Sequence, residues 1–445
     1  MPAKRRWRKG DKMKKRFSMR FLLSLTLFSL IGQVAWVVEN MYLNVFVYNL
    51  FSASAGKISL MVGASAVSAA VTTVFIGALS DKIGRRKLFM CGGYIFWGIS
   101  ILGFSLLRVD LLEKIFPFAS VAALGVAFTI ALDVIMTFFG SSANDAAFNA
   151  WLTDSTSQKN RGIAEGINSM MPLVAILVVF GGFMAFDLKV PSSWTAIFII
   201  IGLVVITIGV LGIFLIKEPP LKPAKEPYFK TVVYGFLPST VKKSPMLYLY
   251  LGGFIIFNIA IQIFMPYLII YYERTLEMSN YVFIMAPAII IASIVTVFFG
   301  KLYDKRGFKL SCAISVGLLS LGFAFLFLFA HVLPVFIGSL LMMCGYLSGM
   351  AVFGAKIRDL TPEGKSGMLQ GVRIFSQVLV PGVIGPYIGK LVLSNAEQIE
   401  NSDGTYSFLP NEFIFLAALI TILILAIYLI TLFIIKRKIY KKEPR

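Results

Sequence analysis

Four ionisable residues lie inside long apolar stretches of the sequence: Glu39, Asp133, Asp145 and Arg373. A charged side chain within a membrane-spanning helix is costly, so such residues commonly mark ion or substrate pathways. A buried carboxyl group can bind a proton or a metal cation and release it when its surroundings change. We therefore predict that these four residues couple a cation to the protein's activity, with Asp133, nearest the middle of its stretch, as the leading carboxyl group.

Two of the four residues have a second interpretation. Asp145 lies nearer the end of its stretch, where a structural salt bridge or a helix cap is equally consistent. Arg373 needs an acidic partner, and a pair with Glu39 or Asp133 across a cavity could be released by a proton or a substrate. A pair with Asp304 or Asp359 would instead brace a gate, and the position of Arg373 near the start of its stretch favours this brace.

Amide and aromatic side chains follow one face of the first apolar stretch. At about 100° per residue, Gln33, Trp36, Asn40 and Asn44 fall on one stripe, with Glu39 beside it. A tryptophan ring stacks on the apolar face of a pyranose while amides bond its hydroxyls; interhelical packing by the same amides is the alternative. Further polar residues predicted to contact a solute are Asn144, Asn258, Gln262, Tyr346 and Gln377.

Enzymatic chemistry finds little support in the sequence. The cysteines Cys91, Cys312 and Cys344 lie in apolar stretches without pairing or metal-ligand spacing, and His331 is the only histidine. The sequence shows no phosphate-binding loop and no activated nucleophile. We predict a protein that is not an enzyme and has no cofactor or metal.

The composition is that of a membrane protein. Of the 445 residues, 58% are hydrophobic and 14% charged, against roughly 45–50% and about 25% in soluble domains. A spanning helix needs about 20 apolar residues. The sequence predicts an all-α polytopic protein with twelve spans: 20–48, 58–80, 88–107, 118–150, 162–187, 194–216, 246–272, 281–303, 310–330, 332–356, 366–391 and 412–435.

Basic residues indicate the orientation of these spans. The net charge is +20, yet 35 of the 42 lysines and arginines lie in the tails and alternate loops of one side, and six on the other. Basic loops stay in the cytoplasm, so both termini are predicted to be cytoplasmic and nucleic-acid binding is not expected. The predicted parts are a basic tail (1–19), a six-helix bundle (20–216), a linker (217–245), a second bundle (246–435) and a basic tail (436–445). The polar stretch 394–411 is expected to be a surface loop with little function of its own.

The two halves repeat a motif. Gly77-Ala-Leu-Ser-Asp81-Lys-Ile-Gly84 recurs as Gly300-Lys-Leu-Tyr-Asp304-Lys-Arg-Gly307, each after the second span of its half. Asp154 and Asp359 begin a second shared segment, Asp-x-Thr, and each precedes a glycine by eight residues. Two related six-helix halves with a central substrate site are a known transporter plan.

The motif that begins at Gly77 and continues through Arg85 and Arg86 resembles the loop signature of the major facilitator superfamily. The segments around Gly32–Leu43, 149–154 and 357–361 are similar to the glycoside-pentoside-hexuronide:cation symporters. Members of that family typically move sugars with a proton or sodium ion. The second span, 58–80, lacks the carboxylates that bind sodium in the melibiose type, which favours a proton here.

The resemblance implies a gate at the cytoplasmic surface. Gly77 would allow close helix approach, and Asp81 would accept hydrogen bonds at a helix N-terminus. Arg85 and Arg86 could pair with Asp154, and in the superfamily such contacts hold the inner gate shut. In the second copy, near Gly300 and Asp304, a phenylalanine replaces the first arginine. Lys309 or Arg306 would then have to pair with Asp359.

Together these features predict a secondary transporter working by alternating access, which couples a sugar or glycoside to a cation. Two alternatives stay open. Forty phenylalanines and eighteen methionines would suit the adaptable cavity of a drug or amphiphile exporter, and a lipid-translocating protein is the other. The expected partners are a small solute, a coupling cation and membrane lipids, in a monomer of the bacterial plasma membrane.

Overall fold

The computed structural model describes residues 17–156, 161–218, 228–278, 280–362, 366–400 and 406–442, and most of them are helical. The first half contains α1 (Met19–Val37), η1 (Val38–Tyr42), α2 (Leu43–Phe51), α3 (Ala55–Ile83), α4 (Arg86–Phe104), α5 (Val109–Ile115), α6 (Val121–Gly140), η2 (Ser141–Phe148), α7 (Asn149–Asp154), α8 (Arg161–Phe183) and α9 (Pro191–Leu215).

The connector and the second half follow in the same manner. They contain α10 (Tyr228–Val233), η3 (Tyr234–Phe236), α11 (Pro238–Lys243), α12 (Pro245–Phe264), η4 (Met265–Tyr267), α13 (Leu268–Ile270), η5 (Tyr271–Thr275), α14 (Val282–Leu328), α15 (Val332–Leu360), α16 (Ser366–Ile374), η6 (Phe375–Leu379), α17 (Val380–Val392), η7 (Leu393–Asn395), β1 (Gln398–Glu400), β2 (Tyr406–Phe408) and α18 (Phe413–Lys442).

Ten helical segments among the described residues are long and apolar enough to cross a membrane. One of them, α14, has 47 residues and contains two of the predicted spans, because its backbone leaves the helical conformation at Gly307. The apolar part of α8, Met170–Phe183, is shorter than the other spans. Each of the twelve predicted spans therefore corresponds to a helix, and the predicted helical membrane fold is confirmed.

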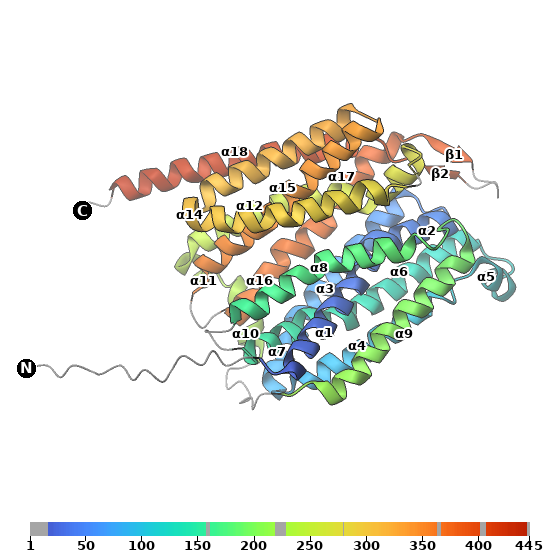
Figure 1. Ribbon diagram of the computed structural model, residues 1–445, viewed down its shortest axis with the longest axis horizontal. Helices are drawn as coiled ribbons and strands as arrows, with labels where there is room; N and C mark the ends of the chain where they lie inside the picture. Colours follow the sequence, from blue (N-terminus) through green and yellow to red (C-terminus); the bar gives the residue numbers. More distant parts are fainter. Residues whose placement is uncertain are drawn as a thin grey trace, which may run out of the picture.

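The helices lie in two groups (Figure 1). One contains α1, α3, α4, α6, α8 and α9, and the other contains α12, α14, α15, α17 and α18. The groups meet where α3 packs against α16 and α17, and where α8 packs against α14. The first helix begins and the last one ends on the same side of the molecule, which we call the terminal side. The opposite side carries α5 and the β1–β2 hairpin, and we call it the hairpin side.

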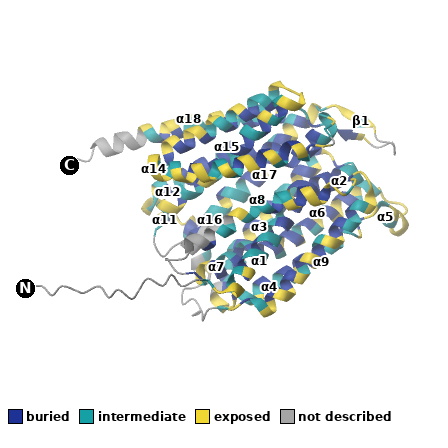
Figure 2. Ribbon diagram, in the orientation of Figure 1, coloured by how far each residue is buried: buried dark blue, intermediate teal, exposed yellow. Residues whose placement is uncertain are grey.

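The outward faces of the bundle are apolar, as a bilayer requires. Figure 2 shows exposed residues along the outer helices, and on α9 and α18 these include Ile199, Leu203, Ile424 and Ile427. Inside, small residues allow close packing. A Cβ atom at Gly98 of α4 would lie 2.6 Å from the carbonyl oxygen of Gly202 on α9.

The repeated motif has the same backbone signature in both halves. Gly84 ends α3 with φ of 70°, and Gly307 lies at the turn inside α14 with φ of 74°. Glycine adopts this left-handed conformation without the steric cost that a side chain brings. The final glycine of each copy therefore turns the chain at the end of a span.

Candidate functional site

The first and fourth spans bring two carboxyl groups together inside the first half. Glu39 on η1 is 7% exposed and Asp133 on α6 is 2% exposed. Glu39 Oε1 accepts hydrogen bonds from Ser65 Oγ at 2.8 Å and from Thr137 Oγ1 at 2.9 Å. Ser65 Oγ also lies 2.7 Å from Thr137 Oγ1, and its hydroxyl faces the Asp133 carboxyl. We call Glu39, Ser65, Asp133 and Thr137 the buried carboxyl cluster.

This cluster has more hydrogen-bond acceptors than donors. Ser65 and Thr137 supply one hydroxyl proton each, and Thr137 also lies 2.8 Å from the backbone carbonyl oxygen of Asp133. Within the described part of the chain, Glu39 Oε2 and Asp133 Oδ1 are buried without a hydrogen-bond partner. An uncompensated buried carboxylate is strongly unfavourable, so the arrangement suits the binding of a proton or another cation.

Ser65 is a site residue that the sequence analysis does not predict. It lies on the face of α3 that meets α6, together with Ser68, whose Oγ donates to the carbonyl oxygen of Val134 at 3.0 Å. The spacing of hydroxyl residues along α3 was a signal for this face. Hydroxyls in helices also commonly bond to their own backbone, so the spacing alone could not distinguish the two roles.

Three π-helical turns coincide with predicted site residues. Glu39 and Asn40 lie on η1, Asn144 and Asp145 on η2, and Gln377 on η6. Such turns insert one residue into a helix and are frequent at functional sites. The inserted residue rotates the side chains that follow it, so a stripe drawn at 100° per residue does not continue through these turns.

The predicted stripe on the first span is accordingly divided. Asn40 is exposed, Gln33 and Trp36 are half-buried, and Asn44 is buried at 1% exposure. Asn40 and Asn44 donate to the backbone of their own helix at 2.8 and 3.0 Å. The Trp36 ring lies 5.0 Å from the ring of Trp97. In this conformation Asn44 is not open to a solute, whereas Asn40 is.

Asn144 is also buried, at 3% exposure. Its Nδ2 atom donates to Tyr94 Oη at 2.7 Å, and Tyr94 Oη donates to the carbonyl oxygen of Phe28 at 2.5 Å. These bonds connect η2, α4 and α1, so Asn144 holds three spans together in this conformation. Asp145 is half-buried, and its Oδ2 atom accepts from Ser141 Oγ at 3.0 Å, a contact within η2.

The predicted residues of the second half lie on α12, α15, α16 and η6. Asn258 is 6% exposed and donates to the carbonyl one turn earlier at 2.8 Å. Gln262, Tyr346, Arg373 and Gln377 are half-buried. The acidic partner predicted for Arg373 stays a prediction.

The gate motif forms one clear ion pair on the terminal side. Arg86 Nε lies 3.2 Å from Asp154 Oδ2, with side chains 8% and 26% exposed. Arg86 also donates to Ser80 Oγ, whereas Arg85 is exposed. Both members of the pair belong to the first half, so the bond joins the third and fourth spans to each other and does not cross between the halves. The side chain of Asp81 lies outside the described residues.

The second copy of the gate places a tyrosine against its aspartate, Asp359. Asp359 Oδ2 accepts a hydrogen bond from Tyr303 Oη at 2.5 Å. The Lys309 ammonium lies 5.6 Å from the ring centre of Phe433, so it is directed at an aromatic face. Tyr303, which the sequence analysis does not name, is therefore a partner of Asp359, and the pairing of Asp359 with Lys309 or Arg306 stays a prediction.

The motif glycines are not tightly packed in this conformation. A Cβ atom at Gly77 would lie 3.9 Å from Ala146 Cβ, and one at Gly300 would meet nothing within 4 Å. Gly300 and Asp304 line a cavity of about 140 Å³ between α14 and α15, and Asp304 itself is exposed. Close helix approach, the reason predicted for Gly77, is therefore not seen at that position in this conformation.

Contacts between the halves close the hairpin side. Tyr42 Oη lies 3.1 Å from Tyr281 Oη, and Arg274 Nη2 donates to Asn49 Oδ1 at 2.7 Å. Each contact joins a residue of the first span to a residue of the second half. The buried carboxyl cluster therefore lies behind a closed seam when approached from this side.

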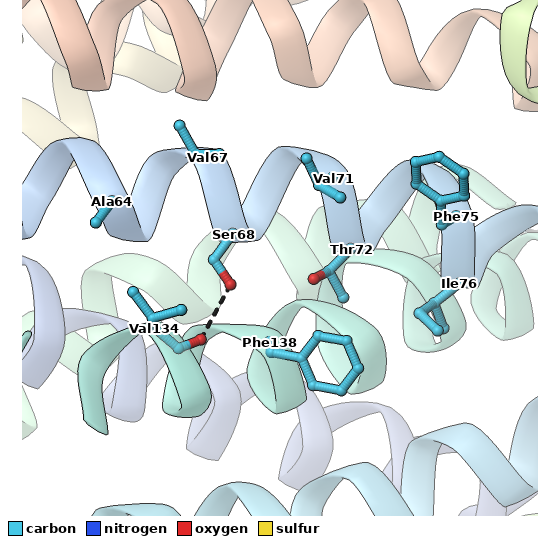
Figure 3. Close-up of a pocket in the computed structure, with 9 residues that line it drawn as sticks. All are labelled: Ala64, Val67, Ser68, Val71, Thr72, Phe75, Ile76, Val134 and Phe138. Atoms are coloured by element: carbon cyan, nitrogen blue, oxygen red, sulfur yellow. Dashed lines mark hydrogen bonds between the residues drawn. The ribbon is translucent and has the colours of Figure 1, made fainter. Parts of the chain in front are cut away.

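An apolar groove runs between α3 and α6 (Figure 3). Its volume is about 530 Å³, and its walls include Val67, Val71, Phe75 and Phe138. All four residues are at least 41% exposed. Among the oxygen atoms drawn at its edge, Ser68 Oγ is already bonded to the carbonyl oxygen of Val134. The groove can hold an apolar group and offers it almost no polar contact.

Comparison with known proteins defines the family of this helical membrane bundle. The model of the Major Facilitator Superfamily matches residues 17–386. The chain belongs to this superfamily and is a secondary transporter, not an enzyme. Membership in the glycoside-pentoside-hexuronide:cation family stays a prediction.

Solved structures share the fold at low sequence identity. A bacterial homolog of the human lysosomal transporter Spinster, inward-facing and unoccupied, is 15% identical with a TM-score of 0.68, covering 93% of this chain and 97% of that one. The nucleoside transporter NupG is 13% identical with a TM-score of 0.65, covering 92% and 98%. The xylose transporter XylE from E. coli, partially occluded and inward open, is 14% identical with a TM-score of 0.65, covering 96% and 100%. No curated protein sequence matches the chain.

Proposed function

We propose that this transporter is a symporter that moves a hydroxylated solute, a sugar or glycoside, together with a proton. The observation that carries the proposal is the buried carboxyl cluster. Glu39 accepts from the hydroxyls of Ser65 and Thr137, the Ser65 hydroxyl also faces the Asp133 carboxyl, and one oxygen atom of each carboxyl group has no partner among the described residues. Because like charges at close range oppose joint ionisation, the pair favours a state that holds one proton.

The solute would bind between the halves, close to this cluster. Asn40 supports this placement because it is exposed and adjacent in sequence to Glu39. A solute hydroxyl bonded to its amide would lie next to the turn that carries the carboxyl group. Gln33, Trp36 and the half-buried Gln377 on η6 are the other residues that we assign to solute contact.

Transport then requires the two halves, residues 20–216 and 246–435, to rock against each other. In the present conformation, contacts between the halves lie on the hairpin side of the cluster, and we assign its proton exchange in this state to the terminal side. We assign the terminal side to the cytoplasm, from the distribution of basic residues, and the protein to the bacterial plasma membrane as a monomer. Each bound proton reduces the negative charge of the pair by one, which lowers the cost of sealing the cluster from water.

Solute counterflow in proteoliposomes tests the proposal. The purified protein is loaded with unlabelled mono- or disaccharide and given the labelled sugar outside. Counterflow needs no ion gradient, so it identifies the solute independently of coupling. We expect transient accumulation of one glycoside. Folded protein that accumulates no member of the panel would refute the sugar assignment.

The apolar groove supports a second candidate, export of an amphiphile. Its exposed walls, including Val67 and Phe138, suit an apolar group that enters from the bilayer. Resistance of expressing cells to lipophilic cations would favour this candidate. Unchanged sensitivity, together with sugar counterflow, would exclude it.

A further inference from the structure

The stretch between the last two spans folds into a hairpin that is attached to the second half. β1 and β2 pair antiparallel, with Gln398 opposite Phe408 and Glu400 opposite Tyr406. Beyond β2, the carbonyl oxygen of Pro410 accepts a hydrogen bond from the hydroxyl of Thr275, at the end of η5. The hairpin is therefore held by the helices on either side of it in sequence and by the seventh span.

One side chain of the hairpin reaches across to the first half. Phe408 is 7% exposed, and its ring meets the ring of Tyr48 edge-on, with centres 5.3 Å apart and planes at 89°. Its other neighbour is Tyr267 of η4, at 6.1 Å and 82°. Tyr48 Oη also donates to the backbone carbonyl oxygen of Phe408 at 2.6 Å. Phe408 is thus inserted between α2 of the first half and η4 of the second.

The surrounding contacts continue the same seam. Tyr267 Oη donates to the carbonyl oxygen of Ala55, at the start of α3, at 3.2 Å. The Arg274 guanidinium lies 5.9 Å from the ring centre of Tyr48 while it donates to Asn49. The contacts of this seam are mostly aromatic pairs and hydrogen bonds from tyrosine hydroxyls to backbone carbonyl oxygens. The seam is therefore held by shape and burial around Phe408 more than by charge.

We propose that the hairpin is a latch, with Phe408 as its wedge, that stabilises the closed state of the hairpin side. Opening of this side separates α2 from η4 and η5. The hairpin moves with the second half, so Phe408 must leave Tyr48, losing one edge-on ring contact and one buried hydrogen bond. The latch thus biases the transporter toward the state in which its hairpin side is closed.

Accessibility of the cavity tests this inference without any assumption about the solute. Asn40→Cys places a thiol on the exposed residue beside the buried carboxyl cluster. Its reaction with a membrane-impermeant maleimide is followed in vesicles with the hairpin side outward, an orientation checked with Tyr406→Cys. The native cysteines Cys91, Cys312 and Cys344 are buried at 6% exposure or less, and the parent protein controls for their reaction.

We expect Phe408→Ala to raise the labelling rate at least about tenfold, which corresponds to about 1.4 kcal/mol. Tyr48→Phe removes only the phenol hydroxyl and should raise it about threefold, and this mild variant keeps the test valid if Phe408→Ala does not fold. Tyr406→Ala is the matched control, because Tyr406 lies two residues away on the same strand and is 60% exposed.

Each outcome decides the proposal. Faster labelling in both seam variants, with the Tyr406→Ala rate within twofold of the parent, supports the latch. Unchanged labelling in folded Phe408→Ala and Tyr48→Phe overturns it. An equal effect of Tyr406→Ala also overturns it, because the hairpin would then act through its general stability and not through the wedge. Failure of sugar counterflow would leave all of these outcomes unaffected.

Discussion

The charge on Glu39 should be required for proton-driven accumulation but not for solute exchange. Glu39→Gln keeps an oxygen that can accept from Ser65 and Thr137, whose hydroxyls lie 2.8 and 2.9 Å from Oε1. Its amide cannot ionise, so only one carboxyl group of the pair, that of Asp133, can still bind and release a proton. The variant therefore imitates the protonated cluster permanently and at similar size.

The magnitude follows from the number of protons that the cluster can exchange. Both carboxyl groups face the same Ser65 hydroxyl, so we expect one proton per transport cycle. A difference of one pH unit is then worth about 1.4 kcal/mol per solute and sustains about tenfold accumulation. Two independently coupled protons would sustain about a hundredfold accumulation at the same pH difference. Glu39→Gln should reduce gradient-driven accumulation to simple equilibration while counterflow stays within about threefold of the parent.

The assay uses proteoliposomes with an imposed pH difference and the glycoside that counterflow identifies. Glu113→Gln, on the exposed helix α5, is the matched control and should accumulate solute like the parent. Tenfold accumulation retained by Glu39→Gln would refute the assignment of the cluster. Accumulation by the parent that follows a sodium gradient and ignores pH would refute the proton as the coupling ion.

Three further predictions concern the scaffold around this site. Asp154→Asn removes the carboxylate that pairs with the nearly buried Arg86 guanidinium, and we expect a loss of about 2 kcal/mol, seen as a lower temperature of thermal unfolding in detergent. A loss of only about 0.5 kcal/mol, the size typical of a surface pair, would contradict this view. Gly98→Val should abolish the yield of monodisperse protein, because its side chain would clash with the backbone of α9, whereas Gly92→Ala, with nothing within 4 Å of its Cβ position, should express normally. Gly84→Ala, at φ of 70°, should cost about 1–2 kcal/mol of stability, and unchanged unfolding would show that the turn relaxes.

The sequence alone determined the membrane fold and its repeat. A continuous apolar stretch of this length crosses a bilayer as a helix, because its backbone N–H and C=O groups must be hydrogen-bonded within the segment. Gly84 and Gly307 occupy the same position in the two copies of the repeated motif, and both adopt positive φ. The ion pair between Arg86 and Asp154 was one of two pairings that the motif predicted.

The partners of the buried polar groups were decided by tertiary structure. The π-helical turns η1 and η2 rotate Glu39 toward Ser65 and Asn144 toward Tyr94, and such turns have no simple sequence signal. A span is apolar both where it faces lipid and where it faces other helices, so its sequence does not show which face packs against a neighbour. The polar stretch 394–411 likewise shows no periodicity that would place Phe408 between the two halves. Local composition determined which segments enter the membrane, whereas contacts between segments distant in sequence determined which side chains meet there.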